Sequence, residues 1–323
     1  MTRRYVTIRL LQIFPTILAI LLVNFALIHL APGDPARVMA GEMAHPDNIE
    51  AIRVKFGLDR PAWEQLVVYL GKIMQGDLGF SYNYLTPVSE LILDRLPQTF
   101  YLMIPASLLS IFLGTLIGAY SASKYPSVTD SAIWITSLGF YSMPIFWFGL
   151  LLILVFSRNL HWFPSGGMYD IIDKKTGIAY LADLTWHAVL PVLTLTAYNL
   201  PIFVRIARAS VIETMKEDFI NTARAIGLSE IRVFMGHALR NALLPTVTVA
   251  GLTLGFVLTG AIMTEAVFSW PGIGLLLWQA ISNRDYPTLM GIFVFASVSV
   301  VVASFLTDMI YVYLDPRVKF ENA

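Results

Sequence analysis

The sequence predicts an all-α protein that crosses a membrane six times, and three observations support this fold class. The 323 residues are 56% hydrophobic and only 14% charged, whereas a soluble domain is about one quarter charged. Six stretches approach the roughly 20 apolar residues with which a helix spans the hydrocarbon core. Lys and Arg are distributed unevenly among the segments between these stretches. The bilayer is therefore the expected solvent.

The predicted spans are nearly free of charged side chains. The first five lack Asp, Glu, Lys and Arg, and the sixth contains only Asp308. The first is longer than the apolar core of a signal peptide, about 7 to 15 residues, and no clear small-residue cleavage site follows it, so we expect a retained helix. The Met143–Pro144 step predicts a kink in the third. The spans comprise residues 10–30, 100–123, 131–157, 187–204, 242–264 and 287–314.

The charges of the short loops predict that both termini are cytoplasmic. In this orientation the cytoplasmic segments carry twelve Lys or Arg residues and the short outer loops carry four. The long segment 31–97 is excluded, because long segments are translocated largely regardless of charge. The expected organisation is residues 1–30 for the cytoplasmic N-terminus and first span, 31–97 for an extracytoplasmic subdomain, 98–314 for a core of five further spans that includes the cytoplasmic segment 211–241, and 315–323 for a cytoplasmic tail.

Two outer segments contain signals for short helices. Between the first and second spans, "PDNIEAIRVKFGL" and "RPAWEQLVVYLGKIMQG" place apolar residues at roughly helical spacing, with Pro or Gly near the ends. They predict a small helical subdomain. Before the last span, "EAVFSWPGIGLLLWQAISNRDYP" predicts a Pro-Gly turn, a short amphipathic helix and a second turn.

The cytoplasmic segment contains an amphipathic pattern. Over residues 211–226 the apolar side chains recur at intervals of three or four, which predicts one helical face. Gly227 fits a C-terminal cap and Ser229 can cap a following helix. The segment therefore predicts a helix, a sharp turn and a second helix. The apolar face comprises Ile212, Met215, Phe219, Ala223 and Ile226.

Such a helix either lies on lipid or docks into a groove of a partner protein. Its polar face mixes acidic and basic residues, which gives little attraction to anionic lipid. An apolar ridge with mixed charges suits a groove on a partner protein better. The polar face comprises Glu213, Lys216, Glu217, Asn221 and Arg224.

The stretch "NTARAIG" resembles the EAA signature of ABC-importer permeases, in which Glu-Ala-Ala is followed by three residues and a Gly. Only Ala223 and Gly227 match the signature itself. Ten residues after the Gly, His237-Ala238-Leu239-Arg240 replaces the general Ile-x-Leu-Pro, and this departure resembles the peptide/nickel branch. The segments "APGDPAR", "GDLGFSY", "TEAVFSWPGIG" and "YLDPRVKF" also occur in order. The chain is thus similar to the B-type permease of dipeptide/oligopeptide transporters.

The resemblance implies a type I ABC-importer permease fold and a set of partners. A second, C-type permease would complete a heterodimeric pathway, and an extracytoplasmic binding protein would deliver di- or oligopeptides. Two cytoplasmic ATPases would bind ATP and Mg, with no cofactor on this chain. Nickel, glutathione and oligosaccharides remain open as cargo.

The same resemblance implies that the cytoplasmic segment seats in an ATPase cleft as a coupling helix. Gly227 would allow the turn. The apolar contact would come from Phe219, Ala223, Ile226 and Leu228, and the polar rim from Glu217, Asp218 and Arg224.

Other patterns restrict the function classes. No G-x-x-x-x-G-K-[ST] motif occurs, so we expect no ATP hydrolysis by this chain. The five His residues form no close ligand pair, which gives no reason to expect a metal site. The formal net charge of zero gives none to expect nucleic acid. A stand-alone secondary transporter or a membrane-embedded enzyme usually carries ionisable clusters within its spans, and none is evident in the sequence.

Two acidic residues keep alternative roles. For Asp308 a structural pair or cap near the cytoplasmic edge is favoured over a place in the pathway. Glu265 either braces the "FSWPGIG" turn or lines the gate, and the sequence does not choose between these roles.

Overall fold

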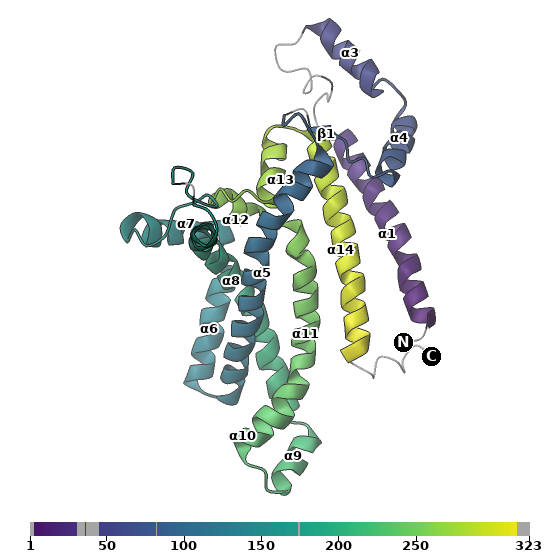
Figure 1. Ribbon diagram of the computed structural model, residues 1–323. Coiled ribbons are helices and arrows are strands. Elements are labelled where there is room, and N and C mark those ends of the chain that lie inside the picture. The colour runs from purple at the N-terminus through teal and green to yellow at the C-terminus, as the bar shows by residue number, and fades with distance from the viewer. Residues whose placement is uncertain (1–2, 31–35, 37–44, 82, 174, 315–323) are drawn as a thin grey trace.

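The protein is an elongated bundle of helices with a small cap of shorter elements at one end (Figure 1). The computed structural model describes residues 3–30, 36, 45–81, 83–173 and 175–314. Below, "outer end" denotes the end with β1 and α13, and "inner end" the end with α9 and α10, following the sidedness that the loop charges predict.

Among the described residues, four helical runs are long and apolar enough to cross a membrane, and a bent pair can form a fifth span. In α1 (Arg3–Leu30) the described apolar part, Leu11–Leu27, is shorter. The all-α membrane class is therefore confirmed, while the count of six spans and the side of the termini stay predictions. The four runs are α5 (Val88–Ser123), α8 (Ile178–Thr214), the run Glu230–Thr259 that includes α11 (Leu239–Gly255), and α14 (Tyr286–Leu314).

The helices extend beyond several predicted boundaries. The helix α5 begins at Val88, so the domain boundary expected after residue 97 falls inside it. The helix α8 is also longer at both ends than the predicted span 187–204. Hydropathy marks only the part of a helix that lies in hydrocarbon, and a helix can continue into water at either end. The predicted tail 315–323 lies outside the described residues.

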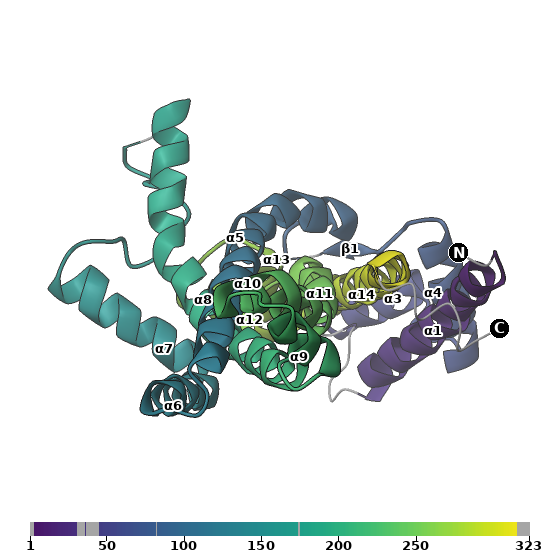
Figure 2. The ribbon, with the colours of Figure 1, turned by 90° about the horizontal axis from the view of Figure 1, so that it is seen from below.

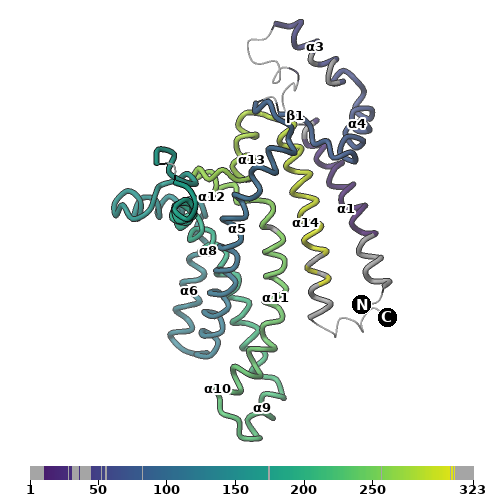
Figure 3. The backbone as a smooth tube through the Cα atoms, viewed as in Figure 1, coloured from purple at the N-terminus to yellow at the C-terminus, as the bar shows by residue number. Residues whose placement is uncertain are grey.

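The predicted interruption at Met143–Pro144 is confirmed, but it is a full break between two helices and not a kink within one helix. The chain forms α6 (Val128–Ser142) and α7 (Ile145–Leu152), continued by the π-helical η1 (Ile153–Asn159), and the two parts are bent by 99°. Met143 adopts an extended conformation, as residues before proline commonly do because the proline ring disfavours the α region. The tube in Figure 3 shows α7 leaving the bundle at this break.

The outer end contains the predicted short helices. The helices α3 (Pro46–Phe56) and α4 (Ala62–Met74) confirm the two expected between the first and second spans. A small antiparallel hairpin pairs β1 (Phe80–Ser81) with β2 (Thr86–Pro87), with Phe80 opposite Pro87. The helix α13 (Ile273–Ser282) confirms the helix expected after the Pro-Gly turn.

The predicted span 242–264 was too long at its outer end. The helix ends in the 3-10 turn η3 (Phe256–Thr259), and Gly260 follows with φ 77°. This left-handed conformation breaks the helical hydrogen-bond ladder, and glycine adopts it without strain. A separate short helix, α12 (Ile262–Val267), then carries Glu265.

Small residues bring the central helices close together. A Cβ added at Gly114 of α5 would lie 2.6 Å from Phe203 Cβ of α8. One added at Gly255 of α11 would lie 2.7 Å from Ala303 Cβ of α14. Close approach of this kind supplies the van der Waals contact on which helix association in lipid depends. Seen from below, α5, α8, α11 and α14 form the packed centre (Figure 2).

Candidate functional site

The inner end has a protruding helix–turn–helix, called here the inner segment (residues 211–241). Its parts are the end of α8, α9 (Asp218–Ala225), α10 (Glu230–Arg232), the π-helical η2 (Val233–Ala238) and the start of α11. In Figure 1, α9 and α10 extend beyond the ends of the other helices. A segment that projects in this way can contact a partner protein.

The single amphipathic helix predicted over residues 211–226 is divided in two. The N–H groups of Lys216 and Glu217 bond to the carbonyls of Glu213 and Thr214, three residues earlier, and α9 then begins after Glu217. This tight turn changes the helix direction, so the periodicity counted across it does not describe one face. Tertiary packing explains the turn, because it brings α9 back against η2.

The turn divides the predicted apolar face between the protein interior and the surface. Ala223 is buried with Ile220 against η2, and Leu228 packs on the same cluster. Phe219 remains 41% exposed and Ile226 72% exposed. Sequence reasoning missed Ile220, since only a break in the helix places it on the buried face. Of the predicted face, the surface therefore offers Phe219 and Ile226, and the exposed Ile231 and Met235 lie in the same segment.

Gly227 ends α9 as predicted. Its φ is 84°, the N–H of Leu228 bonds to the Ala223 carbonyl (3.3 Å), and its own N–H bonds to the Arg224 carbonyl (2.9 Å). This is the double hydrogen-bond pattern of a Schellman cap. Ser229 occupies the N-cap position of α10, but in the described structure its side chain makes no capping hydrogen bond.

The charged residues of the inner segment differ in their surroundings. Glu217 and Asp218 are exposed. Arg224 instead donates from Nε and Nη2 to the two carboxylate oxygens of Glu230, at 2.9 and 3.2 Å. This contact raises the pKa of Arg224 and lowers the pKa of Glu230. The pair joins α9 to α10 across the turn at Gly227. Glu230 was not singled out from the sequence.

A cavity of about 680 Å³ lies beside the inner segment. Its walls come from the α5–α6 turn, the end of α8, and α10 with η2, represented by Tyr125, Met215 and Phe234. Apolar side chains line it together with Lys124, Lys216 and Glu230.

At the outer end the structure decides the role of Glu265. Its side chain is fully buried and accepts hydrogen bonds from Ala261 N (3.1 Å), Leu275 N (3.0 Å) and Thr99 Oγ1 (3.3 Å). Thr99 in turn accepts from Ile273 N (2.9 Å). One carboxylate thus holds the beginnings of α12 and α13 and fixes both to α5. Glu265 braces the turn and does not line an open path.

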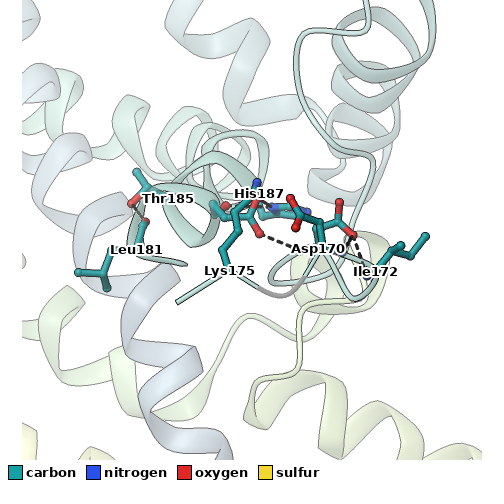
Figure 4. Close-up of polar contacts among 8 residues, drawn as sticks. Asp170, Ile172, Lys175, Leu181, Thr185 and His187 are labelled. Atoms are coloured by element: carbon teal, nitrogen blue, oxygen red, sulfur yellow. Dashed lines mark hydrogen bonds and ion pairs between the residues drawn. The ribbon is translucent and has the colours of Figure 1, made fainter. Parts of the chain in front are cut away.

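A second carboxylate orders the outer loop before α8. Asp183 accepts from Asp170 N (2.8 Å) and from Lys175 Nζ (3.1 Å), and His187 lies beside it. Figure 4 shows Asp170, Lys175 and His187 close together. Asp170 Oδ1 accepts from the N–H groups of Ile172 and Asp173, which lowers the pKa of Asp170. These contacts join the loop to the beginning of α8.

No metal site emerges from these groups. Among the described residues no cluster of three His, Cys, Asp or Glu side chains could hold a metal ion. The side chain of Asp308 lies outside the described part of the chain, so its predicted role as a pair or cap stays open.

The chain matches two families over most of its length. Residues 114–320 match the family described as "Binding-protein-dependent transport system inner membrane component". Residues 1–103 match its N-terminal counterpart, "Binding-prot-dependent transport system membrane comp, N-term".

Curated relatives match nearly from end to end. The Di/tripeptide transport system permease protein DppB of Pseudomonas aeruginosa (strain UCBPP-PA14) is 39% identical, over 98% of this chain and 99% of that protein. The Dipeptide transport system permease protein DppB of Escherichia coli (strain K12) is 36% identical, over 99% of each chain. The Oligopeptide transport system permease protein AppB of Bacillus subtilis (strain 168) is 37% identical, over 98% of this chain and 99% of that protein.

Among solved structures, an inward-facing MetNI methionine ABC transporter is similar in fold, with a TM-score of 0.50 and 17% sequence identity. The match covers 70% of this chain and 97% of that one. With the spans, the inner segment and the full-length relatives, it confirms the resemblance found in the sequence. The chain belongs to the binding-protein-dependent transport system inner membrane components, the permeases of ABC importers, and is a multi-pass protein of the cell membrane.

Proposed function

We propose that this chain is the B-type permease subunit of an ATP-driven importer of di- and oligopeptides. The observation that carries the proposal is the full-length similarity to permeases named for dipeptide, di/tripeptide and oligopeptide transport. The same machinery with nickel, glutathione or an oligosaccharide as cargo is less well supported, because these relatives are all named for peptides.

A second permease of the C type completes the pathway in this proposal, and an extracytoplasmic binding protein delivers the peptide. The helices α3 and α4, in the subdomain expected over residues 31–97, lie at the outer end, where such a protein would dock (Figure 1). Ordered outer elements such as the Asp183-held loop give a docking protein a surface of fixed shape.

The inner segment couples this chain to an ATPase subunit, which carries the ATP and Mg. Phe219 and Ile226 supply the exposed apolar contact, with Glu217 and Asp218 at the polar rim. The other predicted coupling residues act within the segment. Gly227 forms the turn, Ala223 and Leu228 pack α9 onto η2, and Arg224 closes the turn with Glu230. Closure of the ATPases would then move the segment and tilt the helices attached to it.

Purification from native membranes in mild detergent tests the partner assignment. We expect a second permease and Walker-motif ATPases to co-purify with the tagged chain. The variant Phe219→Ser/Ile226→Ser should lose the ATPases and retain the second permease. Val128→Ser is the matched control, since Val128 is 87% exposed at the inner end but lies outside the segment.

Reconstitution with the binding protein tests the cargo. Uptake of a labelled dipeptide should be competed by unlabelled peptides and not by nickel, glutathione or an oligosaccharide. Competition by one of these instead would replace the cargo assignment. Transport by the chain alone, without ATPases, would contradict the importer and favour a secondary transporter.

A further inference from the structure

A buried ion pair joins α6 to α8 near the inner end. Arg208 donates from Nε to Asp130 Oδ1 (2.6 Å) and from Nη2 to Asp130 Oδ2 (2.7 Å). The side chain of Asp130 is only 4% exposed and that of Arg208 21% exposed. A two-pronged contact of this kind fixes both the distance and the orientation of the two planar groups. The pair therefore determines how α6 lies against α8.

The α5 helix and the α5–α6 turn are joined to the same pair. Ser121, near the end of α5, donates from Oγ to Asp130 Oδ1 (2.6 Å). The guanidinium lies 5.4 Å from the ring centre of Tyr125 in the turn and 5.6 Å from that of Trp134 in α6. Lys could not reproduce this arrangement, because a single ammonium lacks the planar fork that binds two oxygens and stacks on rings.

Close packing behind the pair leaves α5 and α8 little freedom to slide. A Cβ added at Gly118 of α5 would lie 3.0 Å from Ala207 Cβ and 3.1 Å from the backbone nitrogen of Arg208. Both are tighter than ordinary side-chain contacts. The same turn of α8 is thus joined to α6 through the ion pair and to α5 through the contact at Gly118.

The same turn of α8 leads directly into the inner segment. The helix α8 ends at Thr214, and Met215 follows. Met215 packs against the cluster that contains Ala119 and Val211, and also against the cluster that contains Ile220 and Ala223. A displacement of α9 is therefore passed to the end of α8, within two turns of Arg208.

We propose that Arg208 is a positioning residue that, through Asp130, makes α5, α6 and α8 move as one body when the inner segment is displaced. The role rests on the proposed function, in which an ATPase displaces that segment. A buried ion pair often adds little stability over an apolar pair of similar volume, whereas its geometry is specific. The position of this pair, between three helices and next to the segment, suits the transmission of movement.

The lack of natural cysteines allows a direct test. Spin labels are placed on Val128→Cys in α6 and Arg232→Cys in α10, within the full importer whose partner chains carry no other cysteine. Electron–electron double resonance then gives the distance distribution between α6 and the inner segment. In Arg208→Gln this distribution should broaden, and the peptide imported per ATP hydrolysed should fall by about tenfold, which corresponds to about 1.4 kcal/mol.

Arg208→Lys keeps the positive charge beside Asp130, so it serves as a second variant in case Arg208→Gln fails to fold. It should show both effects to a smaller degree. Arg205→Gln is the matched control, because it removes the same charge from an exposed position on the same helix. Both measurements should match the parent there.

An unchanged distance distribution and an unchanged import-to-ATP ratio in Arg208→Gln and Arg208→Lys would overturn the proposal. The proposal would also be overturned if import and ATP hydrolysis fell by the same factor while the distance distribution stayed unchanged. In that case the pair would only stabilise the protein. A complex that contains no ATPase would instead overturn the proposed function, and the distance distribution would still decide whether the pair holds the three helices together.

Discussion

The outer turn and the inner segment are both helix–turn–helix elements, but their large side chains are buried in the first and exposed in the second. In the outer turn, between α12 and α13, Phe268, Trp270 and Glu265 are fully buried within the chain. In the inner segment, Phe219 of α9, Ile226 of the following turn and Ile231 of α10 are exposed. The apolar side chains of the outer turn are covered by this chain, whereas those of the inner segment stay exposed, as the proposed docking of an ATPase requires.

The polar contacts differ in the same way. At the outer turn Glu265 accepts backbone N–H donors in a dry environment, where an unmade hydrogen bond is expensive. At the inner segment the side chains of the Arg224–Glu230 pair are 38% and 69% exposed, and exposed pairs contribute little to stability. Substitutions should therefore affect stability at the outer turn and partner binding at the inner segment.

Glu265→Gln should have the largest effect on stability. Gln offers one acceptor oxygen and turns an NH₂ group toward N–H donors, so at least one buried donor loses its partner. We expect a loss of about 3 kcal/mol in the free energy of unfolding. Denaturation of the purified complex measures it, with the exposed Glu90→Gln as control. Equal stability of the two variants would contradict the brace.

Gly272→Ala should have the next largest effect. The backbone of Gly272 is in the extended region, so a side chain causes no strain there. However, an added Cβ would lie 2.6 Å from both Glu265 Cδ and Thr99 Oγ1. Overpacking of this kind costs about 2 kcal/mol. A melting temperature equal to that of the parent would mean that the outer turn has spare room.

Gly227→Val at the inner segment tests the opposite situation. An added Cβ meets no described atom within 4 Å, but φ is 84°. A β-branched residue is strained there, by about 1–2 kcal/mol. The turn would relax, so we expect peptide uptake to fall more than stability, with the chain still in the membrane. Unchanged uptake in reconstituted vesicles would contradict a role for the cap in coupling.

Glu230→Gln should have the smallest effect, visible mainly in its pH dependence. Arg224 lowers the pKa of Glu230 in the folded state. The stabilisation is therefore fully present above the unfolded pKa, roughly 4.3, and is lost as the pH falls through the folded value. Parent and variant should differ slightly in melting temperature at pH 7. This difference should disappear once the pH is below the folded pKa of Glu230. A difference that grows at low pH would exclude this origin.

Local features were predictable because their signals lie in neighbouring residues. The helices α3 and α4 end within two residues of a Gly, and α13 begins directly after the Pro271-Gly272 step. Gly227 adopts the positive φ expected of a helix cap. The break at Met143–Pro144 was located correctly, but its 99° bend was not foreseen, because a proline marks a break and neighbouring helices set its angle.

The inner segment shows why only part of the candidate site could be predicted. Phe219, Ile226 and Gly227 were identified from spacing and from the family signature, and the structure leaves both apolar side chains exposed. Ala223 was expected on the same surface but packs inside, and Ile220 was missed. The count of helical intervals ran across the turn at residues 215–217, where the helix direction changes.

By itself the sequence determined the solvent, the approximate spans, the short outer helices and the Gly227 turn. Hydropathy and backbone preference are properties of a residue and its near neighbours, so the sequence alone shows them. Only the tertiary structure decided that Glu265 meets Thr99, 166 residues away, and that Arg208 meets Asp130, 78 residues away. Such pairs form because packed helices bring distant polar groups into a dry interior, where each needs a partner.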